Sequence, residues 1–420
     1  MMTQPKKVRR KVEALVGIPI ANIITKIEMK RSKLVGPKQV FLPRCRIPMN
    51  YYEREAVQSS RNNRGNNGDQ QQKNQKQQQQ QHPPTILLLH GFGCNAQEFC
   101  SFLRDIDVPP HVRILVPEQI GHGEDLKRAF GATAVVSKEG SKSLLPVYQE
   151  PDAKTLVEST SEFLDVVKVG PNCNALGTSL GGAILYYLRR KRPDIIQKTV
   201  LVAPAILSCL SDGFLNGLVE GKHRFMDFHG RDDVKHLFRN FLWTDPRKRT
   251  SNTNNTNNNN NNKSKRRIKK DPFPKFVYEV VYRLWQRDVP KGHHKALQDT
   301  LLQTHVHNTN GCNESMGIAG GDDNTNGNVD TNSGESTTEP FNNIFASTID
   351  IDRDSSRLLI WPEEDQICDI EKGKQFFGPA VASGRTVLET IQACGHVFRA
   401  DGTPIYEFVV PIAKAFLLDF

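Results

Sequence analysis

The sequence predicts an α/β protein with a mainly parallel sheet, helices on both faces of the sheet, and an inserted helical cap. Three observations predict this fold class. Short apolar runs alternate with helical stretches, a Gly-x-Ser-x-Gly turn joins one such run to a helix, and a long segment between residues 206 and 356 shows no strand pattern. Continuous apolar strands that alternate with helices are typical of parallel sheets covered on both faces.

Six apolar runs make up the predicted sheet. They are residues 85–89, 112–117, 173–176, 199–203, 357–361 and 386–391. The helices predicted to cover it are residues 153–167, 181–190, 372–377 and 406–418. We therefore expect a catalytic core built from two stretches of chain, residues 83–206 and 345–420.

The segment 207–344 lies between the two halves of this core and is predicted to form the cap. Residues 231–243 and 275–286 carry apolar side chains at the i, i+3, i+4, i+7 spacing of amphipathic helices. Two alternatives stay open for these apolar faces: they line an acyl-chain tunnel or a membrane-facing lid, or they pack on the core domain.

Three polar tracts interrupt the globular pattern. Residues 58–82 are rich in Gln and Asn, residues 251–270 combine an Asn run with a basic cluster, and residues 307–339 are rich in Asn, Gly, Asp and Thr. Such compositions bury too little apolar surface to offset chain entropy, so we expect disordered surface loops. Residues 1–57 are predicted to form a basic N-terminal segment and the first strands.

The net charge of +10 is concentrated in the first 38 residues and in residues 263–270. Basic clusters of this kind are either solvated or bind anionic surfaces, so peripheral membrane binding stays open. We expect no nucleic-acid partner, because the clusters lack interleaved aromatic residues and no reader motif is present.

The eight cysteines are scattered, without a CxxC pair or zinc-ligand spacing. This pattern favours a reducing compartment, and we predict neither a metal nor a cofactor. No apolar run approaches the roughly 20 residues of a membrane span, and no signal peptide is evident. We expect a cytoplasmic protein, with membrane association or organelle targeting through the basic N-terminus as alternatives.

The segment Gly177-Thr178-Ser179-Leu180-Gly181 carries the chemistry. The pattern is weak alone, but here an apolar strand precedes it and an apolar helix follows it, which is the arrangement of a nucleophile elbow. Glycines two residues on either side of the serine relieve steric crowding in this strained turn. Ser179 is the predicted nucleophile.

The run His90-Gly91-Phe92-Gly93 follows the first predicted core strand. We expect the backbone N–H groups of Phe92 and Leu180 to form the oxyanion hole, with Leu180 at the amino end of the helix after Ser179. His90, Gly91 and Gly93 are predicted to lie against the substrate, since glycines permit close backbone approach.

The acid and base of a triad are expected downstream of the nucleophile. Three carboxylates, Glu363, Glu364 and Asp365, follow the strand at 357–361, and Asp365 fits best because the loop needs several residues to turn back over the sheet. His396 follows the last predicted strand and is preceded by Gly395. The order Ser179, Asp365, His396 predicts nucleophile, acid and base.

Together these segments resemble the α/β-hydrolase superfamily, and within it the monoacylglycerol lipase-like branch. The resemblance rests on Leu87–Gly93, Pro117–Gly123, Leu176–Gly182, Ile360–Gln366 and Ala393–His396. Two residues depart from the family's usual pattern: Glu118 stands where Asp is usual, and Pro362 where Gly is usual. Pro362 stiffens the loop that carries the predicted acid.

The resemblance implies an α/β-hydrolase fold and hydrolysis of a small acyl ester, with a monoacylglycerol-like lipid as the favoured substrate. A serine nucleophile also permits thioester, amide or carbon–carbon bond hydrolysis on this fold. A non-catalytic interaction protein that keeps the fold is the alternative from another class, and the presence of serine, acid and histidine in order argues against it.

Overall fold

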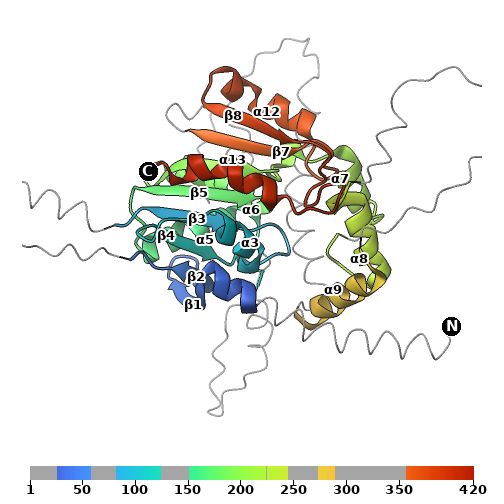
Figure 1. The fold of residues 1–420 in the computed structure, drawn as a ribbon, viewed down its shortest axis with the longest axis horizontal. Coiled ribbons are helices and arrows are strands. Elements are labelled where there is room, and N and C mark those ends of the chain that lie inside the picture. Colours follow the sequence, from blue (N-terminus) through green and yellow to red (C-terminus); the bar gives the residue numbers. More distant parts are fainter. Residues whose placement is uncertain (1–25, 58–81, 124–150, 224, 245–272, 289–355) are drawn as a thin grey trace, which may run out of the picture.

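A computed structural model describes residues 26–57, 82–123, 151–223, 225–244, 273–288 and 356–420 (Figure 1). The described residues form one eight-stranded sheet in the order β1-β2-β4-β3-β5-β6-β7-β8. The strands are β1 Val35–Leu42, β2 Ile47–Arg54, β3 Thr85–Leu89, β4 Arg113–Pro117, β5 Cys173–Thr178, β6 Ile196–Val202, β7 Arg357–Pro362 and β8 Thr386–Ile391. All pairings from β4 to β8 are parallel, whereas β2 runs antiparallel to both β1 and β4.

Helices cover both faces of this sheet. They are α3 Cys100–Asp105, α5 Ala153–Val166, α6 Leu180–Lys191, α12 Ile370–Ala382 and α13 Tyr406–Leu418. Side chains of a strand alternate between the faces. In β3, Leu87 and Leu89 pack in a core with α5, α6 and α12, whereas Ile86 and Leu88 pack in a second core with α3 and α13. The predicted mainly parallel sheet with helices on both faces is confirmed.

The helix predicted at residues 372–377 is longer than expected. In the structure α12 begins at Ile370, because the Asp369 carboxylate accepts hydrogen bonds from the N–H groups of Glu371 and Lys372 and so caps the helix. It also continues past Pro379 to Ala382. The sequence prediction missed the capping aspartate.

The described part of the cap contains α7 Asp212–Val219, α8 Arg231–Leu237 and α9 Lys275–Asp288, which lie along one side of the sheet at the right of Figure 1. The single helix expected at 231–243 is instead α8 followed by a π-helix, η4 Phe238–Leu242, in which the Trp243 N–H donates to the Phe238 carbonyl at 3.0 Å. Single π-helical turns are frequent at functional sites.

The polar tracts predicted at 58–82, 251–270 and 307–339 lie outside the described residues, apart from His82. So do residues 1–25 of the predicted segment 1–57, in which residues 26–32 are helical and β1 and β2 are the first strands. Among the described helices, none is both long enough and apolar enough to cross a membrane.

Candidate active site

Ser179 lies in the tight turn between β5 and α6. Its backbone φ of 52° and ψ of −116° fall in a region that non-glycine residues rarely occupy. The turn depends on its glycines, because a Cβ on Gly177 would lie 2.4 Å from the Gly181 carbonyl oxygen, and one on Gly181 would lie 2.1 Å from the Leu89 carbonyl oxygen. Backbone strain of this kind persists where the surrounding structure over-determines the conformation.

Neighbouring strands and α6 hold the backbone of Ser179 in this conformation. Its N–H donates to the Val202 carbonyl at the end of β6, at 2.9 Å. Its carbonyl accepts from the N–H groups of Ala183 at 3.0 Å and Ala205 at 2.9 Å. The serine side chain is thereby presented at the carboxyl edge of the sheet, where ligands bind in open α/β folds.

His396 and Asp365 meet at the same edge, on the loops after β8 and β7. The Nδ1 atom of His396 donates to Oδ2 of Asp365 at 2.6 Å, and both residues are buried. The other carboxylate oxygen of Asp365 accepts from the N–H groups of Ile367 at 2.8 Å and Cys368 at 3.0 Å. Asp365 is therefore fixed by its own loop, and Nε2 of His396 is left for another partner.

The pKa of His396 reflects opposing effects. Burial lowers it, but the charge of Asp365, the hydrogen bond to Asp365 and the charge of Glu98 outweigh burial and raise the pKa above its ordinary value. An imidazole whose pKa lies above its usual value is a stronger base.

The loop that carries His396 is also bound by the cap. The N–H groups of Val397 and Phe398 donate to the Leu242 carbonyl at 3.1 and 2.9 Å, and the N–H of His396 points to the Phe241 carbonyl at 3.4 Å. These carbonyls belong to the last two residues of η4, where the helix ends and its terminal carbonyls have no intrahelical partner. The cap thus contacts the histidine loop directly, which the amphipathic pattern alone did not predict.

Asp365, Cys368 and His396 form a cluster of potential metal-ligating groups, with one ligand atom of each within 4.8 Å of the others. Two facts weigh against a metal here. Both Asp365 oxygens already accept hydrogen bonds, and burial raises the pKa of the Cys368 thiol well above its usual range, so the thiolate that a metal requires is costly. The geometry suits an acid–histidine pair better.

The predicted oxyanion segment follows β3. Gly91, Phe92 and Gly93 line the cavity that also contains Ser179 and His396, and Leu180 begins α6 directly after the serine. His90 differs from them. It is fully buried, its Nε2 accepts from the Gln119 N–H at 3.1 Å, and Nδ1 lies 2.9 Å from the Gly91 carbonyl.

His90 therefore has a structural role rather than the substrate contact expected from the sequence. Burial lowers its pKa to about 4, so it stays neutral and holds the loop after β4 against the oxyanion segment. His90 is absent from the lining of the described cavity. Substrate contact by the Gly91 and Gly93 backbones stays a prediction.

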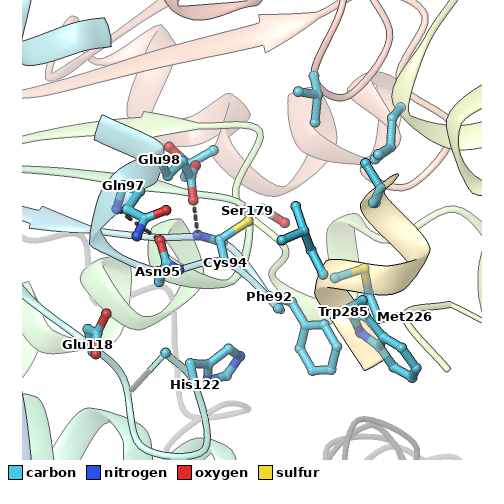
Figure 2. A pocket seen from close by; sticks show the side chains of 18 of the residues that line it. Phe92, Cys94, Asn95, Gln97, Glu98, Glu118, His122, Ser179, Met226 and Trp285 are labelled. Atoms are coloured by element: carbon cyan, nitrogen blue, oxygen red, sulfur yellow. Dashed lines mark hydrogen bonds between the residues drawn. The ribbon is translucent and has the colours of Figure 1, made fainter. Parts of the chain in front are cut away.

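The cavity has a volume of about 870 Å³ and two chemically different sides (Figure 2). The side formed by Phe92 and the cap is apolar, and its cap residues are Phe225, Met226, Phe228, Leu237, Phe238, Leu242, Val281, Leu284 and Trp285. Away from Met226 and Trp285, Figure 2 shows the polar residues Asn95, Gln97, Glu98 and Glu118. The remaining lining includes the polar Lys26, Lys30 and His122 and the apolar Met29, Leu34 and Ile405. Ser179 lies between the two sides in Figure 2, with Phe92, Met226 and Trp285 towards one and Glu98 towards the other.

Glu98 was not singled out from the sequence. It lies in the short helix η1, Ala96–Phe99, and its Oε2 accepts from the Gly91 N–H at 2.8 Å. Its Oε1 accepts from the Tyr406 hydroxyl, which lies 2.7 Å from Oγ1 of Thr178. The sequence carries no signal for it: Glu98 stands among the polar residues Asn95, Gln97 and Ser101, and no motif distinguishes it from a surface residue.

Comparisons with known proteins agree with this architecture. The model of the alpha/beta hydrolase family matches residues 86–404. A search of curated proteins gives no match. Among solved structures, the chain is similar to a candidate lipase from Acinetobacter baumannii AYE, with a TM-score of 0.56, 16% identity, and coverage of 94% of this chain and 95% of that one.

It is also similar to a membrane phospholipase A described as a bacterial virulence factor, with a TM-score of 0.56, 15% identity, and coverage of 98% of this chain and 94% of that one. At these identities the structural likeness shows the fold. The family model covers most of the chain, both halves of the core and the serine and histidine loops. The chain belongs to the alpha/beta hydrolase family.

Proposed function

We propose that this chain is a serine hydrolase that cleaves carboxylic esters through an acyl-enzyme intermediate. The observation that carries the proposal is the 2.6 Å hydrogen bond between His396 and Asp365, at a cavity that His396 and Ser179 both line. Ser179 is the nucleophile, His396 the general base and Asp365 the acid that orients the imidazole.

In the proposed reaction, His396 takes the proton of Ser179 as its Oγ attacks the acyl carbonyl. The backbone N–H groups of Phe92 and Leu180 receive the developing oxyanion, and Asp365 stabilises the imidazolium. His396 then returns the proton to the departing alcohol. Water attacks the acyl-enzyme with His396 again as base, which releases the carboxylic acid and restores Ser179.

The proposed substrate is a lipid ester such as a monoacylglycerol, in line with the monoacylglycerol lipase-like branch. The division of the cavity supports it, because an acyl chain fits the apolar cap side and a hydroxylated alcohol fits the polar side. Two proteins of this fold are described as a candidate lipase and a phospholipase A, and we extend acyl-lipid chemistry to this chain as part of the proposal.

Covalent labelling tests the chemistry. A fluorophosphonate probe should label the full-length protein and the control Ser383→Ala, whose serine is exposed at the end of α12, but not Ser179→Ala. The labelled peptide should contain Ser179. Absence of label on the folded wild-type protein would contradict the serine mechanism and favour a non-catalytic role.

A substrate panel tests the class of ester. Monoacylglycerols of increasing chain length should be hydrolysed with higher kcat/KM than short-chain nitrophenyl esters, since the apolar side of the cavity gains contact with each added methylene. Faster turnover of matched acyl thioesters would move the proposal to a thioesterase.

We further propose a cytoplasmic protein that binds anionic membrane surfaces peripherally through its basic N-terminal segment. Co-sedimentation with liposomes that contain anionic lipid tests this proposal. The full-length chain should sediment, and a chain lacking residues 1–25, which leaves β1 and the cavity lining intact, should remain in the supernatant. Equal sedimentation of the two would exclude this segment as the anchor.

A further inference from the structure

Two segments that are distant from each other in the sequence meet at the carboxyl group of Glu98, and a third is linked to it through Tyr406. One oxygen holds the N–H of Gly91, directly before Phe92 of the predicted oxyanion hole, at 2.8 Å. The other accepts from Tyr406, and Thr178 donates to Tyr406 at 2.7 Å. Because Ser179 follows Thr178, Glu98 links the oxyanion segment to the nucleophile turn.

The charge of Glu98 also reaches the histidine. Together with Asp365, it is one of two carboxylates whose charges raise the pKa of His396. Glu98 lies among the lining residues of the cavity, on the opposite side from the cap (Figure 2). A charge in such partly desolvated surroundings acts on its neighbours more strongly than in bulk water.

The other titratable groups around this pair stay neutral. Burial raises the pKa values of the Cys94 thiol and the Tyr406 phenol well above their usual ranges. Glu98 itself has a pKa above its ordinary value, because burial raises it and the hydrogen bonds from Tyr406, Gly91 and Cys94 and the charge of His396 oppose that rise only in part. The charges that act on His396 from the described residues are thus those of Asp365 and Glu98.

We propose that Glu98 is a positioning residue for the hydrolytic reaction: its carboxylate fixes the Gly91–Phe92 backbone for the oxyanion and stabilises the imidazolium of His396. The inference rests on the proposed serine mechanism. In that mechanism, the negative charge of the tetrahedral intermediate forms beside Phe92 while a positive charge forms on His396. Glu98 is connected to both places, through a hydrogen bond at one and through its charge at the other.

The substitution Glu98→Gln removes the negative charge of the side chain and keeps its size and shape. A glutamine oxygen can still accept from Gly91, and its amide can donate to Tyr406, which can then donate to Thr178. The matched control is Asp105→Asn. Asp105 is the last residue of α3, the helix that follows η1, and its carboxylate pairs with Arg104 at the surface. The rate of fluorophosphonate labelling of Ser179 is measured from about pH 5 to about pH 9, so no substrate needs to be known.

In the wild type and in Asp105→Asn, labelling should rise with pH through the same midpoint, set by His396. In Glu98→Gln the midpoint should fall by about half a pH unit, because the imidazolium loses a stabilising charge, and the plateau rate should fall about two- to threefold because the base is weaker. A Glu98→Gln protein with the wild-type midpoint and plateau would overturn the inference.

Tyr406→Phe provides the second variant. It breaks the connection to Thr178 and keeps the charge, so the plateau should fall several-fold while the midpoint stays at the wild-type value. If Glu98→Gln does not fold, a wild-type plateau in Tyr406→Phe overturns the inference. Wild-type protein that takes no label overturns the proposed function itself, and the inference with it.

Discussion

The carboxyl edge of the sheet and the helical cap enclose the same cavity by different means. At the sheet edge, backbone groups fix the site: Ser179 is held by three backbone hydrogen bonds, and Asp365 by two N–H groups of its own loop. In the cap, side chains do the packing, with rings such as Phe228 and Trp285 at 5.1 Å and Phe214 and Phe225 at 5.1 Å.

From this difference we expect the sheet edge to determine the catalytic step and the cap to determine which substrate binds. Backbone hydrogen bonds and glycine contacts set positions within tenths of an ångström, which a proton transfer requires. Apolar side-chain packing tolerates volume changes more readily, so it can adapt to different ligands without loss of the fold. Substitutions at the sheet edge should therefore affect turnover or folding, and substitutions in the cap should affect substrate affinity.

The largest effect is expected at the acid loop. Asp365→Asn keeps the shape of the side chain but no longer fixes the imidazole tautomer or stabilises the imidazolium, so kcat should fall about 10³- to 10⁴-fold with little change in KM. Steady-state hydrolysis of a short-chain ester measures it. Glu363→Gln, two residues earlier, should retain activity, and an equal loss there would place the acid elsewhere in the loop.

A loss of folding is expected at the nucleophile turn. In Gly181→Ala the new Cβ would lie 2.1 Å from the Leu89 backbone oxygen, so β3 or α6 must shift, and the free energy of unfolding should fall by about 3 kcal/mol or more. Urea unfolding measures this change.

The matched change in the cap is Gly213→Ala in α7, where a Cβ meets nothing within 4 Å. Alanine should raise the free energy of unfolding there by about 0.5 kcal/mol, because it favours the helix over the unfolded chain. A similar loss in both variants would refute the contrast between the sheet edge and the cap.

The sequence predicts the sheet edge well for a physical reason. Strands β3, β5 and β7 are buried along their length, and β6 from Thr199 onward, so their sequences are rich in consecutive apolar residues. The turn at Ser179 requires glycines at fixed positions. The Asp365–His396 pair follows from the order of strand ends, because parallel strands bring their carboxyl ends to one edge.

The sequence predicts the rest poorly because tertiary contacts decide it. Nothing in residues 231–243 shows that the helix widens at Phe238, or that the carbonyls at its end accept hydrogen bonds from the histidine loop. Glu98 and Tyr406 are far apart in the chain, so their hydrogen bond has no local signal. His90 has a motif-like position but packs inward, because Gln119 binds its ring.

The loop of His396 contacts both the sheet edge and the cap, and His396 should set the pH dependence of hydrolysis. The base must be neutral to act, so kcat/KM should fall about tenfold per pH unit below the pKa of His396, which lies above the ordinary 6.5. Hydrolysis rates across this range measure it. A midpoint below 6.5 would contradict the effect of Asp365 on the imidazole.

As pH rises, the contribution of His396 to the free energy of unfolding should fall, whereas activity should rise. A pKa that is raised in the folded state stabilises the fold fully below the unfolded pKa, and this stabilisation is lost as pH rises through the folded value. The difference in unfolding free energy between wild type and His396→Gln should therefore shrink over the same pH window in which activity appears. Comparing the two proteins cancels the contribution of His90, whose pKa is lowered.

The smallest effect is expected in the cap, and it is the one that bears on substrate. Leu284 of α9 lines the cavity and lies outside the two buried cores, so Leu284→Ala should leave the melting temperature and the kcat for short-chain esters unchanged. For a long-chain monoacylglycerol, KM should rise about fivefold, since losing contact with part of an acyl chain costs about 1 kcal/mol. The control Val219→Ala changes a cap residue that is 65% exposed and should leave both substrates unaffected. An equal rise in KM for short and long esters would mean that the cap does not read chain length, and the acyl chain would then have to lie on the polar side beside Glu98.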